Sequence, residues 1–214
     1  MYKFIENNFD NLKVDKNLQI IDIFDWVFGT KKVFIKANCK LAYLIVAKNA
    51  KIEIDVFTEW SGSDIQIFAI FVGDKKPLRV NVKTQINHSN TVVKKHFVSL
   101  VWDDSKMDVD GSINVSKWIK NVVWNLLEEN VILWKKVSIK IKPALNVASK
   151  DVMTSHGAKI EKIGADKLFY MTSKGLNPAN SQKLVVEGYV SDILSHFPGL
   201  DDKISNKIRK IIRI

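Results

Sequence analysis

One histidine, His156, stands in a setting where an imidazole could bind a metal. It lies in the segment SHGA at residues 155 to 158, and no second histidine or cysteine occurs within ten residues of it. Imidazole is a common metal ligand. A lone histidine can also be structural, with its ring nitrogens satisfied by a backbone carbonyl and by a hydroxyl such as that of Thr154 or Ser155. The residues alone leave both roles open.

The other candidate ligands are too dispersed to match the spacing of a metal site. The remaining histidines are His88, His96 and His196, and the single cysteine is Cys39. One cysteine excludes an intrachain disulfide and an all-cysteine metal site, and it makes a reducing cytoplasm the simplest compartment. The sequence has no glycine-rich phosphate loop, no G-x-S-x-G motif and no HExxH motif. It therefore lacks the common nucleotide, hydrolase and zinc signatures.

A cluster of acids offers a catalytic alternative. Paired carboxylates on a β-solenoid can cleave polysaccharides, and the residues available for this chemistry are Asp103, Asp104, Asp108 and Asp110. Aspartates at strand ends more often form turns. The DVDG segment at 108 to 111 is not a calcium loop, because lysines stand at positions 106 and 117 where that loop needs acids. A β-solenoid enzyme acting on polysaccharide remains an alternative.

The formal net charge is +10, from 33 basic and 23 acidic residues. Such a charge permits attraction to nucleic acid, to an anionic membrane or to an acidic protein surface, so a basic nucleic-acid-binding module is a second alternative. Many lysines fall at alternate positions of strand-like runs, where a solvated strand face explains them: Lys51, Lys83, Lys136 and Lys140. We expect neither nucleic acid nor a membrane as the partner.

No apolar run reaches the length of about eighteen residues that a membrane span needs. The start, MYKFIENNFDNLK, has no basic flank, apolar core or cleavage site, so we expect no secretory signal. The six tryptophans are expected in the core or at an interface.

Between about residue 18 and residue 150 the recurring signal is an alternation of apolar and polar residues. It is clear in KIEIDVF, PLRVNVKTQI, DVDGSINV and KVSIKIK, and β-branched residues dominate these runs. The pattern predicts a β domain, and by itself it allows a sandwich, a barrel or a solenoid. In a solenoid the last coil needs a covering element, and the segment after residue 165 could supply it.

The segment after residue 165 contains the start and stop signals of three helices. The first ends at Gly175, which can adopt the left-handed conformation of a C-cap. The second begins at Asn177-Pro178, a capping residue followed by proline at the first helical position. Its apolar residues form one stripe: Val186, Tyr189, Val190, Ile193, Leu194 and Phe197. The third helix has isoleucines opposite basic residues, so it packs on the body or binds an acidic surface.

The segment from Asp151 to Leu194 resembles the C-terminal region of the SufB/SufD family, the scaffold proteins of SUF iron–sulfur cluster assembly. The specific combination is SHGA, then LFY, a lysine–glycine step and a helix rich in leucine and valine. Upstream, GSINV and KIKPALNVASKDV match the family's approach to this motif, and INHSNT at 86 to 91 is similar to its histidine-containing turn. The sequence is closest to the SufD side, and shorter than familiar members.

This resemblance implies a right-handed parallel β-helix with C-terminal helices that close it. It implies three regions: an N-terminal extension (1–17), a β-helix core (18–160) and a helical domain (161–214). It also implies two partners, a second SufB-type or identical protomer along the β-helix and a SufC-like ABC ATPase on the helices. The residues we expect to contact the ATPase are Leu168, Phe169, Tyr170, Gly175, Tyr189 and Val190.

The resemblance also implies a role for His156 as a ligand of a transient iron–sulfur cluster at the interface with the partner protomer. Clusters are held chiefly by thiolates, and this stretch has no cysteine. We therefore expect the partner to supply the thiolate and no cluster to be held stably by this chain alone. Lys174 replaces the family's usual arginine before Gly175. We therefore interpret the sequence as that of a non-enzymatic, cytoplasmic scaffold subunit that acts through His156 and the helical segment.

Overall fold

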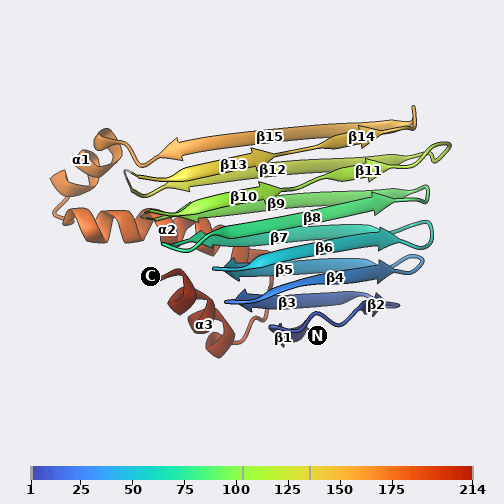
Figure 1. Cartoon of the computed structure of the whole chain (residues 1–214), viewed down its shortest axis with the longest axis horizontal. Coiled ribbons are helices and arrows are strands. Elements are labelled where there is room, and N and C mark those ends of the chain that lie inside the picture. Colours follow the sequence, from blue (N-terminus) through green and yellow to red (C-terminus); the bar gives the residue numbers. More distant parts are fainter. Residues whose placement is uncertain (1, 103, 135, 214) are drawn as a thin grey trace.

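The computed structural model describes residues 2–102, 104–134 and 136–213, which wind into a flattened parallel β-helix followed by three helices (Figure 1). One face is a seven-stranded sheet of β1 (Tyr2–Glu6), β3 (Leu18–Asp25), β5 (Lys40–Lys48), β7 (Asp64–Gly73), β9 (Thr91–Val101), β12 (Val122–Ile132) and β15 (Val152–Lys162).

The opposite face is an eight-stranded sheet. Its strands are β2 (Leu12–Val14), β4 (Phe28–Ile35), β6 (Lys51–Thr58), β8 (Leu78–Ile86), β10 (Lys106–Asp110), β11 (Ile113–Val115), β13 (Ser138–Lys142) and β14 (Leu145–Val147). Strand pairs within both sheets are parallel, and each strand pairs with the strand one coil away in the chain. The predicted parallel β-helix is confirmed, and the sandwich and the barrel are excluded.

The strands begin earlier in the chain than the apolar alternation indicates. β1 pairs with β3, and β2 pairs with β4, so residues before 18 already take part in both sheets. At the other end β15 continues to Lys162. The family resemblance placed residues 1–17 in an extension, and in the structure most of them belong to the first coil.

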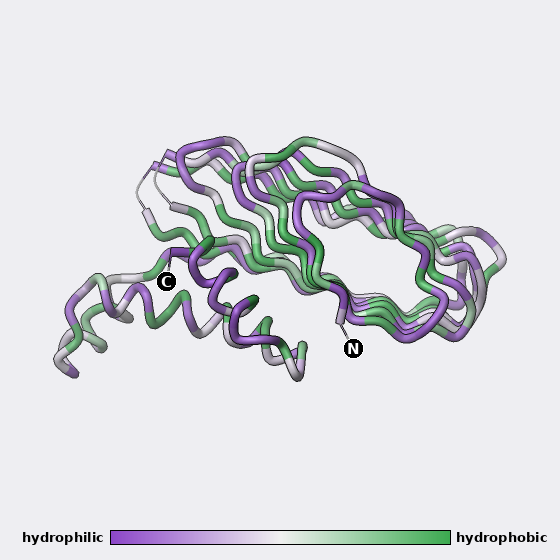
Figure 2. Tube along the Cα trace, turned by 90° about the horizontal axis from the view of Figure 1, so that it is seen from below, coloured by the Kyte–Doolittle hydropathy of each residue, from purple (hydrophilic) through white to green (hydrophobic). Residues whose placement is uncertain are grey.

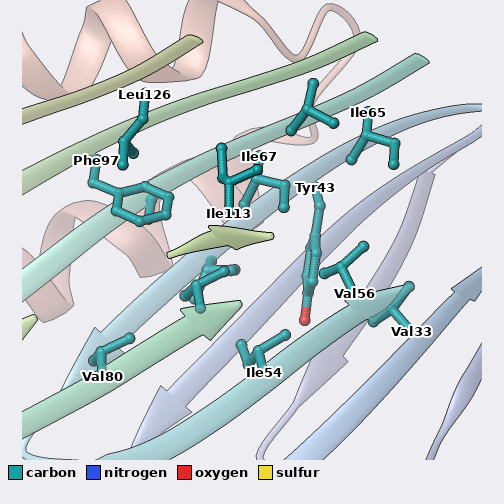
Figure 3. Packing of buried hydrophobic residues seen from close by; sticks show 14 of the residues in the cluster. Val33, Tyr43, Ile54, Val56, Ile65, Ile67, Val80, Phe97, Ile113 and Leu126 are labelled. Atoms are coloured by element: carbon teal, nitrogen blue, oxygen red, sulfur yellow. The ribbon is translucent and has the colours of Figure 1, made fainter. Parts of the chain in front are cut away.

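Alternation in the sequence explains which side chains enter the space between the sheets. In β6, Ile52, Ile54 and Val56 are buried, whereas the residues between them face outward. Because paired residues of neighbouring parallel strands point to the same side, these aliphatic side chains stack coil upon coil (Figure 3). Each buried aliphatic side chain contributes roughly 1.5–3 kcal/mol relative to an exposed one.

The outer face of the seven-stranded sheet is also apolar where the helices cover it. Leu44 and Val46 of β5 and Phe68 and Ile70 of β7 form a second cluster with residues of the helices. The helices are α1 (Ala165–Ser173), α2 (Pro178–Ser195) and α3 (Asp202–Ile212). Figure 2 shows them beside the coils rather than across an end. The expectation that they close the open end is therefore wrong, because the outer sheet face offers the apolar surface they need.

The predicted helix boundaries are confirmed at their caps. The Asn177 side chain accepts a hydrogen bond from the Asn180 amide at 2.8 Å, with Pro178 as the first helical residue. Gly175 has a φ of +89°, the left-handed conformation expected after α1. None of the described helices is both long and apolar enough to cross a membrane.

The third helix packs on the body of the protein. Ile208 and Ile212 are buried in the cluster beneath the helices. Polar contacts also hold α3 on the body. Arg209 of α3 pairs with Glu187 of α2 at 2.7 Å, and the Lys48 ammonium of β5 donates to the Ile211 carbonyl of α3 at 3.0 Å. Of the two roles expected for this helix, packing on the body is therefore the one observed.

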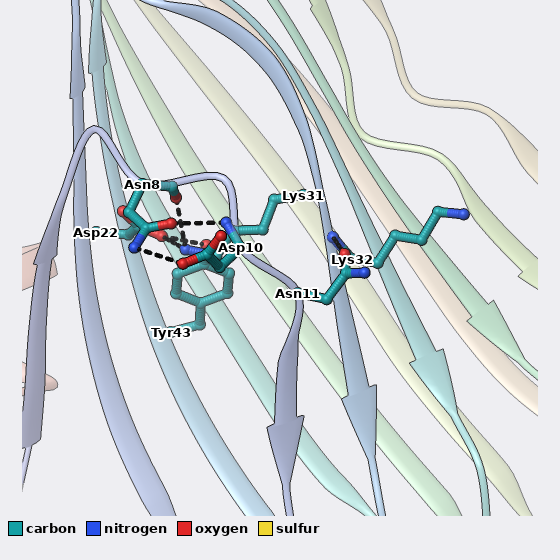
Figure 4. Close-up of polar contacts among 7 residues, drawn as sticks. All are labelled: Asn8, Asp10, Asn11, Asp22, Lys31, Lys32 and Tyr43. Atoms are coloured by element: carbon teal, nitrogen blue, oxygen red, sulfur yellow. Dashed lines mark hydrogen bonds and ion pairs between the residues drawn. The ribbon is translucent and has the colours of Figure 1, made fainter.

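Two buried lysines bridge the space between the sheets. Lys31 of β4 forms an ion pair with Asp22 of β3 on the opposite sheet, and the Tyr43 hydroxyl donates to the same carboxylate at 3.0 Å (Figure 4). The Lys31 ammonium also donates to the Asn8 carbonyl at 3.1 Å. Burial raises the pKa of Asp22 despite these partners. This network fixes the distance between the sheets in the first coils.

The second buried lysine is Lys95 of β9, and no carboxylate of the described residues lies at ion-pair distance from it. Its ammonium donates to the carbonyls of Val82 at 2.8 Å and Ser112 at 2.9 Å on the opposite sheet. Burial lowers the Lys95 pKa to about 7 and raises the pKa of nearby Glu128 to about 7. Both carboxylate oxygens of Glu128 are buried without a hydrogen-bond partner in the described structure. A Cβ atom at Gly111 would lie 2.5 Å from one of them, so this position requires glycine.

Glu128 gives a prediction about pH. Between its ordinary pKa of 4.5 and the folded value of about 7, the unfolded chain loses a proton that the folded protein keeps. The free energy of unfolding therefore falls as pH rises through this window, at about 1.4 kcal/mol per pKa unit and by up to about 3 kcal/mol. Glu128→Gln has no titrating carboxyl at this position, so this fall in the free energy of unfolding should disappear. Denaturant unfolding at pH 5 and pH 7 measures the free energy of unfolding of both proteins.

The free energy of unfolding of the variant minus that of the wild type should be larger at pH 7 than at pH 5. Other carboxylates titrate equally in both proteins and cancel in the comparison. The lowered Lys95 pKa makes stability rise with pH above about 7. Loss of the Glu128 charge lowers the Lys95 pKa further in the variant, which widens the difference between the two proteins in the same direction. Parallel pH curves for the two proteins would contradict the assignment.

Candidate functional site

The last coil of the β-helix is uncovered. Its long strand β15 pairs with β12 on one edge, and no described strand pairs with its other edge. The residues of β12 that face the interior are buried, among them Trp124, Leu126 and Glu128. Their partners on β15 are Thr154, His156 and Ala158, and all three are exposed. The same inward column is thus buried in one coil and open to solvent in the next.

We call this uncovered surface the end face. It is formed by the inward side of β15 and of β13 and β14, which lie opposite it in the same coil. Besides polar His156 it is largely apolar, and its other members are Ile139, Ile141, Val147, Thr154, Ala158 and Ile160. Ile160 is 58% exposed and Val147 is 43% exposed. An unpaired edge of eleven residues next to apolar side chains is a surface on which another strand can add.

His156 lies near the middle of β15, on the inward side because its register partner is Leu126. No hydrogen bond or ion pair joins its ring to any described residue. The adjacent Ser155 points to the other side, where its hydroxyl accepts a hydrogen bond from the Asn125 amide at 2.7 Å. The backbone and hydroxyl partners of a structural histidine are therefore missing in the described structure. Both ring nitrogens are free to bind a ligand.

The other three histidines do have partners. His88 makes a 2.9 Å hydrogen bond with the Thr58 carbonyl, and His96 makes a 2.8 Å contact with the Glu129 carboxylate beneath α2. The His196 ring stacks on Phe68 with 4.2 Å between centroids. These three act in packing, which agrees with the structural role that their isolated positions in the sequence indicate.

Cys39 cannot join His156 at one metal. It lies just before β5, and four strand spacings of roughly 4.8 Å separate β5 from β15 in the seven-stranded sheet, or about 19 Å. The thiol is buried, donates to the Ala37 carbonyl at 3.3 Å, and has a pKa raised by burial. The described residues contain no group of three or more histidine, cysteine, aspartate or glutamate side chains placed to hold a metal ion.

The described acidic residues of the polysaccharide alternative have other contacts or positions. Asp103 lies outside the described residues. Asp104 is an exposed turn residue, Asp108 contacts Arg79 at 3.6 Å, and Asp110 accepts a hydrogen bond from the Ser112 amide at 3.0 Å. These acids serve as turn residues and surface partners, the more common role of aspartates at strand ends.

The residues expected to contact an ATPase divide into two groups. On α1, Phe169 is 74% exposed and Tyr170 is 65% exposed, with Leu168 half-buried beside them. On α2, Val190 is fully buried, and Tyr189 is half-buried with its hydroxyl donating to Glu161 at 3.3 Å. The stripe of α2 packs on the sheet.

Val190 is therefore unavailable to a partner, contrary to expectation. Gly175 serves as the helix C-cap described above. The exposed apolar side chains of the helices are those of α1 together with Leu184 of α2, which is 53% exposed.

Fold and site together define a parallel β-helix protein that presents one free imidazole on an uncovered apolar end. A family model agrees with this class: the SufBD core domain, described as SUF system FeS cluster assembly, matches residues 25–189. That match covers most of the chain, so the protein belongs to the SufBD core family.

Three curated relatives are similar to parts of the chain. The SufBD family protein slr0076 of Synechocystis is 27% identical over 113 residues, which are 53% of this chain and 25% of the relative. Protein ABCI7, chloroplastic, of Arabidopsis thaliana is 22% identical over 142 residues, 65% of this chain and 30% of the relative. The iron–sulfur cluster assembly protein SufD of Escherichia coli is 24% identical over 135 residues, 56% of this chain and 32% of the relative.

The matched part therefore covers about a quarter to a third of each relative. The family model also extends the likeness beyond the segment recognisable in the sequence, which began at Gly111. The earlier strands carry only the alternation common to many β proteins, so no specific motif marks them.

Proposed function

We propose that this protein is a non-catalytic scaffold subunit of a SUF-type iron–sulfur cluster assembly complex in the cytoplasm. The observation that carries the proposal is the free imidazole of His156 on the end face of a SufBD core domain. The cluster is the cargo of such a complex. This chain contributes one ligand to it during assembly.

The ligand count requires a partner. Iron–sulfur clusters are bound mainly by thiolates, with histidine as an occasional ligand. The thiol of Cys39 is buried and lies several coils away from His156. A second SufB/SufD-type protomer that carries a cysteine supplies the missing thiolates, and the cluster is then held between the two proteins.

The end face is the surface we assign to that protomer. No described strand pairs with one edge of its strand β15 over eleven residues, and its inward side chains occupy the positions that the preceding coil buries. A partner strand that adds to this edge satisfies the backbone groups of β15 and covers Ile160 and Ala158. His156 then lies inside the interface.

The exposed surface of α1 is the site we assign to a SufC-like ABC ATPase. Phe169 and Tyr170 are large exposed aromatic residues on one short helix, and Leu184 adds apolar area on α2. Aromatic residues of this kind dominate the binding energy of protein interfaces. Because α2 and α3 are anchored on the sheet, a movement of the bound ATPase reaches the β-helix through packed helices.

The first prediction concerns the cluster. His156→Ala in a complex reconstituted with a SufC-like ATPase and a cysteine-bearing scaffold should lower bound iron and sulfide at least tenfold, because it removes a ligand. Assembly of the complex should persist, since the imidazole forms no hydrogen bond or ion pair with the described residues of this chain. Iron and sulfide analysis and size-exclusion chromatography measure the two outcomes.

Ser155→Ala is the matched control. Ser155 is the neighbouring residue, but its side chain points to the outer face, where it contacts Asn125. Its replacement should leave the cluster content unchanged. Equal cluster content in the His156 variant and the wild type would disprove the ligand role.

The second prediction concerns the end face. Ile160→Asp should weaken association with a second protomer at least tenfold, because a carboxylate would have to be buried in an apolar contact. Ile160 is 58% exposed in the single chain, so the melting temperature should change little. Light scattering on the chain alone and mixed with a SufB-type protein gives the association constants.

Met153→Asp is the control for this experiment. Met153 lies on the same strand and is 72% exposed, but it pairs with Val123 and faces outward. If both variants associate equally well, the end face is not the protomer interface.

The third prediction concerns the ATPase. Phe169→Asp should abolish ATPase binding while the fold persists, because Phe169 is mostly exposed on α1. Val92→Asp places the same charge on an exposed valine at the start of β9 and should bind normally. Binding is measured by pull-down and calorimetry with the purified ATPase. Normal binding by the Phe169 variant would remove α1 from the interface.

A further inference from the structure

Trp26, in the turn between β3 and β4, combines backbone strain with exposure. Its φ is +58°, in the left-handed region that bulky residues avoid. Neighbouring corners of the β-helix use asparagine in that conformation, for example Asn49 at φ +50° in the next coil. Asparagine adopts it far more readily than tryptophan does. The indole is nevertheless 61% exposed, so burial in the core does not compensate for the strain. Strained residues of this kind gather at binding sites.

The Trp26 side chain forms a wall of a groove, which we call the Trp26 groove. It has a volume of about 560 Å³ and runs across the ends of the strands of the eight-stranded sheet. Phe28, which is 75% exposed, lines the groove together with Trp26. The groove is therefore aromatic at one end.

The rim of the groove is basic. Five cationic side chains line it, and Asp108 is the one acidic residue among the lining residues. Asp108 already contacts Arg79 at 3.6 Å. The four lysines, Lys51, Lys76, Lys106 and Lys140, form no ion pair with any described residue. They keep their full charge for a ligand.

The register of the strands places these groups in a row. Phe28 pairs with Lys51, Lys51 with Arg79, Arg79 with Asp108, and Asp108 with Lys140. Four strand spacings of roughly 4.8 Å make this row about 19 Å long. An extended peptide of about six residues covers that length at roughly 3.3 Å per residue.

We propose that the Trp26 groove binds an extended acidic peptide segment of a partner protein, with one large apolar side chain between Trp26 and Phe28 and carboxylates against the four lysines. The groove lies on the opposite sheet from the helices and is distinct from the surfaces assigned to the second protomer and the ATPase. Charge complementarity and the two exposed aromatic rings, Trp26 and Phe28, select this occupant.

A single-stranded nucleic acid fits the groove less well. Such ligands stack their bases on open aromatic faces. The Lys76 ammonium already lies over the Trp26 ring, 5.8 Å from its centroid, and occupies one of its faces.

The test uses the full chain and a fluorescein-labelled peptide of seven residues with one central phenylalanine flanked by aspartates and glutamates. Fluorescence anisotropy should show saturable binding that weakens as salt rises from 50 to 300 mM. Trp26→Asn should weaken binding at least tenfold while the melting temperature stays equal or rises, because asparagine relieves the strain. Replacing the peptide's phenylalanine with alanine should weaken binding similarly.

Trp118→Asn is the matched control. The backbone of Trp118 is also in the left-handed region, at φ +66°, and its side chain is 92% exposed. Trp118 lies in the turn before β12, outside the groove. Its variant should bind the peptide like the wild type.

Three results would overturn the proposal: no saturable binding of the peptide, equal weakening by both tryptophan variants, or stronger Trp26-dependent binding of a labelled oligothymidine than of the peptide. The last result would assign the groove to nucleic acid.

Discussion

A coil of a parallel β-helix can bury its inward side chains only against the coils on either side of it. This constraint explains both the sequence and the surface of the protein. Many interior positions repeat aliphatic residues from coil to coil, so Ile54 of β6 stacks beside Val82 of β8 in the same inward column. The last described coil has no neighbour, and its inward side is consequently exposed. The surface that we assign to a partner follows directly from the way in which the fold is built.

The helices cover apolar surface on the outer face of the seven-stranded sheet. The middle of the seven-stranded sheet is apolar on both faces, and exposed apolar area of that size would promote aggregation. The α2 stripe covers it, with Val186, Val190 and Ile193 buried against the sheet. Covering the side instead of the end leaves β15 accessible. Helix α1 contributes only Leu168 as a half-buried contact, and its aromatic residues remain outside.

Sequence patterns predicted a β domain because alternation and β-branched residues are local signals, and the family resemblance then selected the parallel β-helix. They also located Asn177, Pro178 and Gly175 at the helix ends, since capping depends on a few adjacent residues. They did not show what the α2 stripe packs on, because an apolar stripe fits an open coil end and a sheet face equally well. The near-continuous apolar runs LAYLIVA at 41 to 47 and IFAIFV at 67 to 72 were the available signal, since strands buried on both faces lose their alternation. The exposure of His156 came from the family resemblance, and the Trp26 groove depends on a backbone dihedral angle that no residue pattern reveals.

The polar residues of the interior show how the fold tolerates charge without making a site there. Lys31 and Lys95 each reach from one sheet to groups on the other, so the long lysine side chain spans the interior and its ammonium finds oxygen atoms at the far wall. These ammonium groups are almost fully buried and cannot contact a ligand from solvent. His156 differs from them in position, not in type: it belongs to the same inward column as Lys95 and Leu126, one coil further on. A side chain that would be part of the core in any inner coil becomes a free ligand only because the stack ends there, and for that reason its chemistry depends on what covers the end.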